Sequence, residues 1–357
     1  MKLRTLIIAA LAGVCCSTTA QTEVSAYRPG VTPEGAVYLL PRTALRFVVQ
    51  IEKTTYTPGE FAPYAERYLG LHDVKSEPAV SYAITSIKMT PVGLPDTARC
   101  YSFVFNAKSA ASNLQLSEDG ILLAINAEAR PIVHPAPFVP ARKPATINPR
   151  QFLNETVLAA GSVAKRAELT AQEIFDIRES KNHLIRGEAD FMPQDGEQLR
   201  LMLNSLERQD LALTTLFTGT TERDTTEQVI VECPMSELKD FVLFRFSRHL
   251  GLLDRDDMAG APCYMTVEDL HALPEAVPVD AKKKKPREKG IYVNVAGRIK
   301  VDLTMNAQSM ATYELSAGQF GRPDLLSEDL FNKRYTTHIL LDPTTGAIEK
   351  IDVENIK

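Results

Sequence analysis

The residues best suited to hold a metal ion are the aspartates of the segment LDRDDMAG, Asp254, Asp256 and Asp257. A calcium loop of the EF-hand type needs acidic ligands at alternating positions and a glutamate at its twelfth position. Here the fifth position is Met258 and the twelfth is Met265, so the segment is interpreted as a charged turn. The six histidines are widely dispersed and no H-E-x-x-H motif occurs, so no metal site is predicted.

Motifs for nucleophilic catalysis and phosphate binding are also missing from the sequence. The chain has no G-x-S-x-G elbow, no S-x-x-K series and no glycine-rich phosphate loop. Acidic groups such as Glu179, Glu188 and Asp190 occur, but a chain with 45 acidic residues supplies such groups by chance. No catalytic residue and no cofactor are therefore assigned, and a catalytic site assembled only in space stays an open alternative.

Two groups of residues suit recognition better than catalysis. The first combines aromatic rings with an arginine near a Pro-Gly turn, and such side chains bring large or forked contact areas to binding surfaces. It consists of Tyr56, Phe61, Tyr64, Arg67 and Tyr68. The alternative for this group is a helix that packs its aromatic face on the first sheet. The second group is a basic run that suits anionic head groups or polyanions, with a solvated loop as the alternative. It consists of Lys282, Lys283, Lys284, Lys285, Arg287 and Lys289.

Composition excludes some classes of protein. Of 357 residues, 44% are hydrophobic and 24% are charged, which is ordinary for a globular protein. The net charge of −5 argues against a general nucleic-acid binder, because such a protein needs a basic surface. The chain contains no tryptophan, which excludes sugar-binding platforms built on that side chain.

The first twenty residues, MKLRTLIIAALAGVCCSTTA, have the pattern of a secretory signal peptide that is cut before Gln21. Their apolar run is too short to cross a bilayer as a helix. A lipoprotein signal with acylation at Cys15 or Cys16 is the alternative, although the residues before both cysteines fit it poorly. The sequence therefore predicts export to the periplasm or the outer cell surface, with no transmembrane helix.

Export leaves Cys100, Cys233 and Cys263 in the mature chain, an odd number that permits at most one disulfide within a monomer. Buried, inert thiols are the favoured interpretation, and a bridge between Cys233 and Cys263 is the alternative. A catalytic cysteine has no supporting motif.

The elements that position these residues begin with a β-rich N-terminal domain at 21–130. Alternating apolar residues indicate its strands, and Pro41 indicates a bulge or an edge in the first of them. Strands are expected at 36–52, 80–89, 100–106 and 121–126, with a short helix at 61–69. A segment with six prolines follows at 131–150, and we interpret it as a stiff linker between domains or an extended surface crossing.

The remaining residues, 151–357, are predicted to form an α+β domain. It begins with a helical pair at about 171–218 and ends with a β-rich tail at 225–357. Apolar residues recur at three- and four-residue steps in both helices, so we expect a helical hairpin that lies on a sheet.

Capping signals set the expected starts of the two helices. Thr170 and Glu173 form a capping box, which starts the first helix at Ala171. Asp195 caps the second helix, with Gln198 at its third position.

Several stretches of this sequence resemble a known family. They are VYLLPRTALRFVVQIEKTTYTPGEFAPYAERYLGL at 37–71, AQEIFDIRESKNHLIRGEADFMPQDGEQLRLMLNSLERQDLALTTLFTG at 171–219, GLLDRDDMAGAPCYM at 251–265, QFGRPDLLSEDLF at 319–331 and LDPTTGAI at 341–348. Together they resemble a family of secreted Bacteroidetes proteins, domain of unknown function 4831, over nearly all of the mature chain. The resemblance implies an exported protein of mixed α/β build, and it implies no activity and no catalytic residues.

The sequence as a whole predicts an α+β fold, with β-rich N- and C-terminal portions and a central amphipathic two-helix element. The leading hypothesis for function is a non-catalytic cell-envelope protein that binds another envelope protein or a cell-surface polymer. One alternative is a hydrolase that acts on glycans or peptides with a spatially assembled site. The other is a structural subunit of a surface assembly. An exposed apolar patch would favour binding or assembly, and a deep pocket with a carboxylate of raised pKa would favour the hydrolase.

Overall fold

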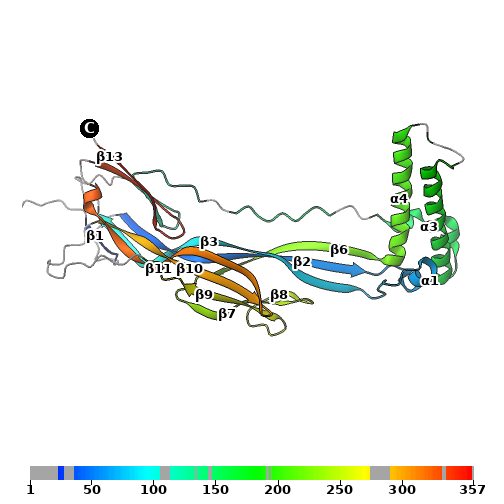
Figure 1. The fold of residues 1–357 in the computed structure, drawn as a ribbon, viewed down its shortest axis with the longest axis horizontal. Coiled ribbons are helices and arrows are strands. Elements are labelled where there is room, and N and C mark those ends of the chain that lie inside the picture. Colours follow the sequence, from blue (N-terminus) through cyan, green and yellow to red (C-terminus); the bar gives the residue numbers. More distant parts are fainter. Residues whose placement is uncertain are drawn as a thin grey trace, which may run out of the picture.

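The computed structural model describes residues 23–27, 36–104, 113–132, 135–143, 147–189, 193, 195–273, 290–331 and 335–355. In these residues the protein is a long rod, with strands along most of its length and helices gathered at one tip (Figure 1). The strands form three antiparallel sheets, so the fold is α+β, as the sequence predicts.

The first sheet runs along the rod and contains two strands that are long for a globular protein. Its order is β1 (Glu23–Ala26), β3 (Ala79–Val104), β2 (Ala36–Thr57) and β6 (Thr220–Glu232). The 22 residues of β2 span about 70 Å at about 3.3 Å per residue. This length sets the elongated shape of the molecule.

The two strands expected within 80–106 are in fact one continuous strand, which corrects the prediction. Pro91 and Pro95 lie between the two predicted strands, and both are accommodated inside β3. β1 pairs only with residues 101–104 of β3, so β3 is an outer strand beside the two prolines. A proline has no backbone N–H group and cannot donate a hydrogen bond to a neighbouring strand. An outer strand tolerates it where that N–H would have faced solvent and not a second strand.

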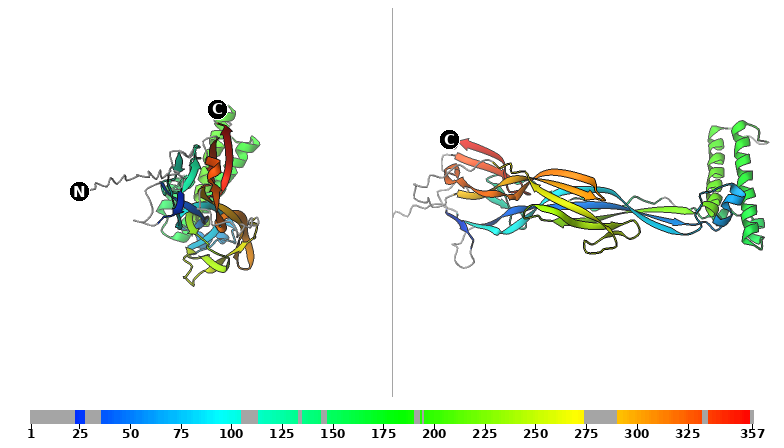
Figure 2. Two further views of the ribbon diagram at one scale, coloured as in Figure 1. Left: turned by 90° about the vertical axis from the view of Figure 1, so that its left-hand side faces the viewer. Right: turned by 60° about the horizontal axis from the view of Figure 1, so that its bottom comes forward.

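The other two sheets pack against the first (Figure 2). The second sheet has the order β11 (Gln308–Ser327), β10 (Gly290–Met305), β9 (Ala261–Asp269), β7 (Leu238–Ser247) and β8 (Gly251–Leu253). The third has the order β13 (Ile348–Asn355), β12 (Tyr335–Leu341), β5 (Leu122–Ile125) and β4 (Leu114–Leu116).

Three hydrophobic cores follow one another along the rod. The central core lies between the first two sheets, where Phe47 of β2 and Leu303 of β10 are fully buried. A second core joins the first and third sheets around Tyr38 and Ile339. The third core is helical and surrounds Phe217. The rod is therefore built from three packed units that are placed end to end.

Most of the helices belong to the third unit. They are η1 (Ala62–Tyr64), α1 (Ala65–Leu69), η2 (Pro149–Phe152), α2 (Glu155–Ala159), α3 (Val163–Arg186) and α4 (Gly196–Thr218), while η3 (Glu328–Phe331) lies near the third sheet. The short helix expected before Gly70 is confirmed, because α1 ends there with Gly70 in the left-handed conformation.

The first long helix begins earlier than the sequence predicts. Ser162 caps α3 by accepting a hydrogen bond from the backbone N–H of Lys165, so the capping box at Thr170 is wrong. Thr170 lies buried inside α3 and its hydroxyl donates to the carbonyl of Arg166. The start of α4 is confirmed, since the Asp195 carboxylate accepts the N–H of Gln198 at 2.6 Å.

The expectation that the helical hairpin lies on a sheet is also wrong. The buried residues of α3 and α4 pack on one another and on Phe61 and Ala65, at the end of the β2–β3–β6 ribbon. Figure 2 shows the two helices standing across the axis of the rod at its tip. The segment before α1 supplies enough apolar surface to close this core without a sheet. We call residues 61–74 and 149–218 the head.

A ribbon of three strands without a core connects the head to the two packed sheets. It consists of residues 53–57 of β2, 79–81 of β3 and 220–224 of β6, and none of them is buried. We call this ribbon the stalk. The first sheet therefore carries the head beyond the region where the second sheet supports it.

The proline-rich segment runs beside this ribbon. Residues 135–143 form neither helix nor strand, and they follow the rod between the sheets and the head (Figure 1). The amino group of Lys143 lies 2.6 Å from a carboxylate oxygen of Asp224 and 3.5 Å from one of Glu222. This segment is thereby tied to the stalk.

Candidate functional site

The predicted aromatic group gathers where the stalk meets the head. The Tyr56 hydroxyl lies 2.7 Å from the carbonyl oxygen of Lys75 and 3.0 Å from that of Thr218, so it joins β2 to the loop after α1 and to the end of α4. Phe61 is buried in the head, with its ring centroid 5.4 Å from that of Phe217. These two side chains hold the head on the stalk.

The other members of the group lie on the outside of α1 and its start. The rings of Tyr64 and Tyr68 are 6.2 Å apart, and the guanidinium of Arg67 lies 5.3 Å from the centre of the Tyr68 ring. Both tyrosines are half-buried against the helical core, and Arg67 is exposed. The structure thus brings the five predicted residues to one place and divides them between packing and surface.

A hydroxyl-rich groove of about 670 Å³ lies beside this group. It separates the loop at 70–75 from one face of the stalk. Its polar walls come from Thr54, Tyr56, His72, Asp73, Ser81, Thr218 and Thr221. The groove is shallow and open, because it forms between a loop and a ribbon that has no core.

The free end of the α3–α4 hairpin forms a second groove, of about 630 Å³. Leu184, Met202 and Leu206 supply its apolar walls, and His183 and Glu188 stand at its rim. Outside this groove, large apolar side chains of the head face solvent. They are Leu158, Val163, Phe175, Ile185, Leu201 and Leu211, with exposed fractions between 40% and 61%.

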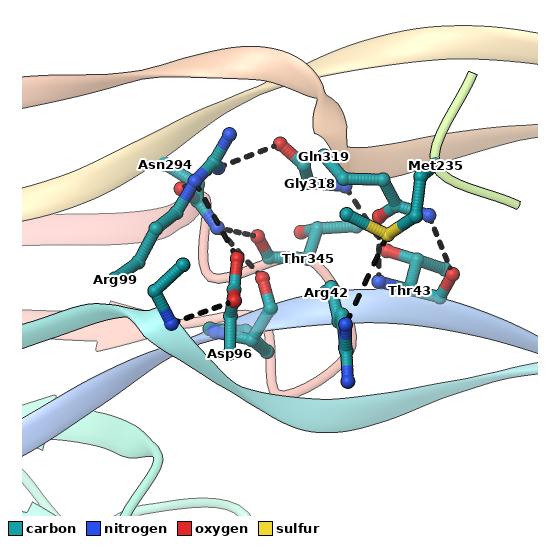
Figure 3. A network of polar contacts seen from close by, with 11 residues as sticks. Arg42, Thr43, Asp96, Arg99, Met235, Asn294, Gly318, Gln319 and Thr345 are labelled. Carbon is teal, nitrogen blue, oxygen red and sulfur yellow. Dashed lines mark hydrogen bonds and ion pairs between the residues drawn. The ribbon is translucent and has the colours of Figure 1, made fainter. Parts of the chain in front are cut away.

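Between the central core and the core around Tyr38, a network of polar side chains joins the three sheets (Figure 3). We call it the junction. The amide nitrogen of Asn294 on β10 donates to the carbonyls of Pro41, at 2.9 Å, and Thr345, at 2.8 Å. Its amide oxygen accepts from the guanidinium of Arg99 at 2.9 Å. Asn294 is 1% exposed, so these hydrogen bonds replace those that its side chain would form with water in the unfolded chain.

Thr43 and Gln319 form the second half of the junction. The Gln319 side chain accepts the N–H of Thr43 at 2.7 Å and donates to its carbonyl at 2.8 Å, as a neighbouring strand would. The Thr43 hydroxyl donates to the carbonyl of Thr344 and accepts the N–H of Gly318. The turn at Asp342–Gly346 is thus fixed against both β2 and β11.

Backbone geometry at the junction brings β2, β3 and the turn close together. The predicted bulge is confirmed by a register shift between Leu39 and Pro41, which turns the Pro41 carbonyl toward Asn294. Gly93 on β3 faces the turn so closely that a Cβ there would lie 2.0 Å from the carbonyl oxygen of Pro343. The donors and acceptors of the Asn294 amide are all used, so the junction acts as a structural clamp.

The other predicted residues fall in different places. The basic run from Lys282 to Lys289 lies outside the described residues. The three cysteines are free thiols. Burial in the central core raises the pKa of Cys263 to about 11, and the Cys233 sulfur lies 3.8 Å from the carbonyl oxygen of Thr43. The aspartate-rich segment folds as a turn, in which Asp257 accepts the N–H of Ala259.

Sequence reasoning missed the junction because its members come from five separate segments. Only the turn at 342–346 and the bulge at Pro41 carried a local signal. Among the described residues no group of three or more histidines, cysteines, aspartates or glutamates could hold a metal ion. Each helix in that part of the chain is too short or too polar to cross a lipid bilayer.

These regions define the molecule as an elongated α+β protein, with a clamped β-sheet body and a helical tip. The family model of the domain of unknown function DUF4831 matches residues 34–349, so the chain belongs to this family. The predicted membership of this domain family is thereby confirmed. No curated protein and no solved structure matches the chain significantly.

Proposed function

We propose that this chain is an exported, non-catalytic interaction protein of the cell envelope, which binds another envelope protein through its head. The observation that carries the proposal is the set of apolar side chains that face solvent on the head. Leu201 and Leu211 on α4 are each 60% exposed, and Ile185 on α3 is 61% exposed. Apolar surface gathered on one small unit is typical of a site that a partner covers.

The placement of the head supports the same proposal. The stalk has no buried residue, so it contributes distance from the body and little packing. The head stands across the tip of the rod, where a partner can reach both long helices without meeting the sheets (Figure 2). The signal peptide predicted at 1–20 supports the envelope compartment.

The experiment is photo-crosslinking in the cell that produces the protein. A photoreactive amino acid replaces Leu201 or Leu211 in the full chain, and Thr221 on the exposed stalk is the matched control position. We expect one envelope protein to form adducts from both head positions and not from the stalk. Leu201→Glu with Leu211→Glu is expected to abolish the adduct formed from a third head position, Ile185, while the helical circular dichroism stays unchanged.

Two results would contradict the proposal. Equal adducts from the head and from Thr221 would mean that the head is not a specific surface. Absence of any adduct, with the protein soluble and alone after fractionation, would favour the hydrolase instead. Glycan and peptide substrates would then be screened.

A further inference from the structure

The first sheet has one face against which neither of the other two sheets packs. Side chains alternate along its strands, so Phe47 and Val49 of β2 point into the central core. The residues that alternate with them, Arg46 and Val48, point to the opposite side. This outer face continues across the neighbours of β2, because Val48 pairs with Lys88 on β3 and with Val229 on β6.

Aliphatic side chains and cations share this outer face. Arg46 pairs with Val231 on β6, and Val229 and Val231 are 48% and 49% exposed. Closer to the junction, Arg42 pairs with Leu94 on β3. The central strand thus carries two arginines with aliphatic side chains on both sides. We call Arg42, Arg46, Val48, Lys88, Val229 and Val231 the basic–apolar face.

The three cations of this face have no acidic partner. None of Arg42, Arg46 and Lys88 forms an ion pair with a described residue. Arg42 makes one side-chain hydrogen bond with a described residue, to the sulfur of Met235 at 3.9 Å, and its Nε atom is buried with no hydrogen-bond partner among those residues. A buried donor without a partner costs free energy, so a bound acceptor group would stabilise this nitrogen.

The next row of the same sheet shows the contrast. There Gln50 donates to Glu227 at 2.8 Å and accepts from Ser86 at 2.8 Å. One row further toward the stalk, Arg223 faces Glu52. The amide and charged groups of these two rows are therefore paired within the chain, unlike the cations of the basic–apolar face.

We infer that the basic–apolar face binds a protein segment that carries carboxylates next to aliphatic side chains. Carboxylates supply the partners that Arg46 and Lys88 lack, and aliphatic side chains cover Val229 and Val231. A sulfated polymer or an anionic lipid head group would satisfy the cations and leave the valines in water. A purely apolar partner would bury the cations without partners, at a large cost in free energy.

The edge of the sheet also favours a protein segment. β6 is an outer strand of the first sheet and, among the described residues, pairs only with β2. Its free edge offers main-chain N–H and C=O groups to an extended peptide. This face is separate from the head, so the inference does not depend on the function proposed above.

The test is fluorescence anisotropy with the purified exported chain and a labelled synthetic peptide of alternating glutamate and valine. A peptide of alternating glutamine and valine is the neutral control. We expect the acidic peptide to bind about tenfold more tightly than the neutral one. Arg46→Glu with Lys88→Glu is expected to weaken binding by about tenfold or more, and Val231→Asp by a similar factor.

Lys239→Glu is the matched control, because Lys239 is an exposed lysine on β7 of the second sheet. It is expected to leave the affinity within about twofold. The milder variants Arg46→Gln and Lys88→Gln are measured in parallel, and they decide the outcome if the charge reversals alter the circular dichroism. Leu201→Glu on the head is expected to change nothing in this assay.

Two results would overturn the inference. A loss of affinity in Lys239→Glu equal to that of the double variant would mean general attraction between charges. Binding that is insensitive to Val231→Asp, and that heparin or anionic phospholipid vesicles abolish, would identify a surface for polyanions instead of one for a protein segment.

Discussion

The junction lies between the two cores of the sheet region, the head lies at the tip of the rod, and the two are held together by different forces. The junction joins five segments that are far apart in the chain, and it does so with buried hydrogen bonds around Asn294 and Thr43. The head joins residues 61–74 to the helices of 149–218 by apolar packing around Phe217. Buried hydrogen bonds fix the geometry of the sheets, whereas apolar packing holds the head and leaves large apolar side chains exposed.

The stalk between them makes this comparison testable. Because none of its residues is buried, the stalk couples the packing of the head only weakly to the packing of the sheets. We therefore expect the head and the body to unfold in separate transitions. The helical signal in the far-ultraviolet reports the head, and hydrogen exchange read by mass spectrometry reports the body.

The largest effect is expected from Phe217→Ala. Phe217 is fully buried and packs against Phe61 with tilted rings, so its loss leaves a cavity in the helical core and costs about 4 kcal/mol. Chemical denaturation should lower the midpoint of the helical transition and leave exchange in the β-strands unchanged. Phe175→Ala is the control, because Phe175 lies on the same hairpin with 47% of its surface exposed. If Phe217→Ala destabilised the β-sheets as much as the head, the two would not unfold independently.

Asn294→Ala tests the junction in the same way. It removes three hydrogen bonds and leaves the buried carbonyls of Pro41 and Thr345 without this donor, which costs about 3 kcal/mol. Exchange should accelerate in β2, β10 and the turn at 342–346, while the helical transition keeps its midpoint. Asn204→Ala, at an exposed site on α4, is the control. A shift of the helical transition alone would contradict the assignment of Asn294 to the body.

A smaller effect, confined to the head, is expected from Asp195→Ala. The Asp195 carboxylate satisfies the N–H of Gln198 at the start of α4, and loss of such a cap costs about 1 kcal/mol. The helical midpoint should fall by this amount in denaturation experiments. Asp195→Asn keeps an acceptor at the same place and should restore most of the loss. If asparagine and alanine behaved alike, the cap would not contribute.

The same contrast explains what the sequence could predict. The head is made of local signals: Asp195 at a helix start, Gly70 at a helix end and apolar residues at helical spacing. These features were predicted, except for the start of α3, which is capped by Ser162 and not by Thr170. The junction depends on contacts between positions such as 43 and 319, which no local pattern relates. The outer face of the first sheet was missed for the same reason, because Arg46, Lys88 and Val231 come together only through strand pairing.

The smallest effect is expected from Asp302→Asn, which provides an exposed counterpart to the buried bonds of Asn294. Lys300 and, to a lesser degree, Thr312 donate hydrogen bonds to the Asp302 carboxylate and lower its pKa below the ordinary value of 3.8. Because the folded pKa is the lower one, this contribution to stability is present above about pH 4 and is lost as the pH falls through the folded pKa. The wild-type protein should therefore be slightly more stable than Asp302→Asn at neutral pH, and the two should converge in acid when their denaturation midpoints are compared. If the difference between their denaturation midpoints widened in acid, the folded-state pKa of Asp302 would be raised and not lowered. A gap as large as that of Asn294→Ala would mean that burial is not what separates the two sites.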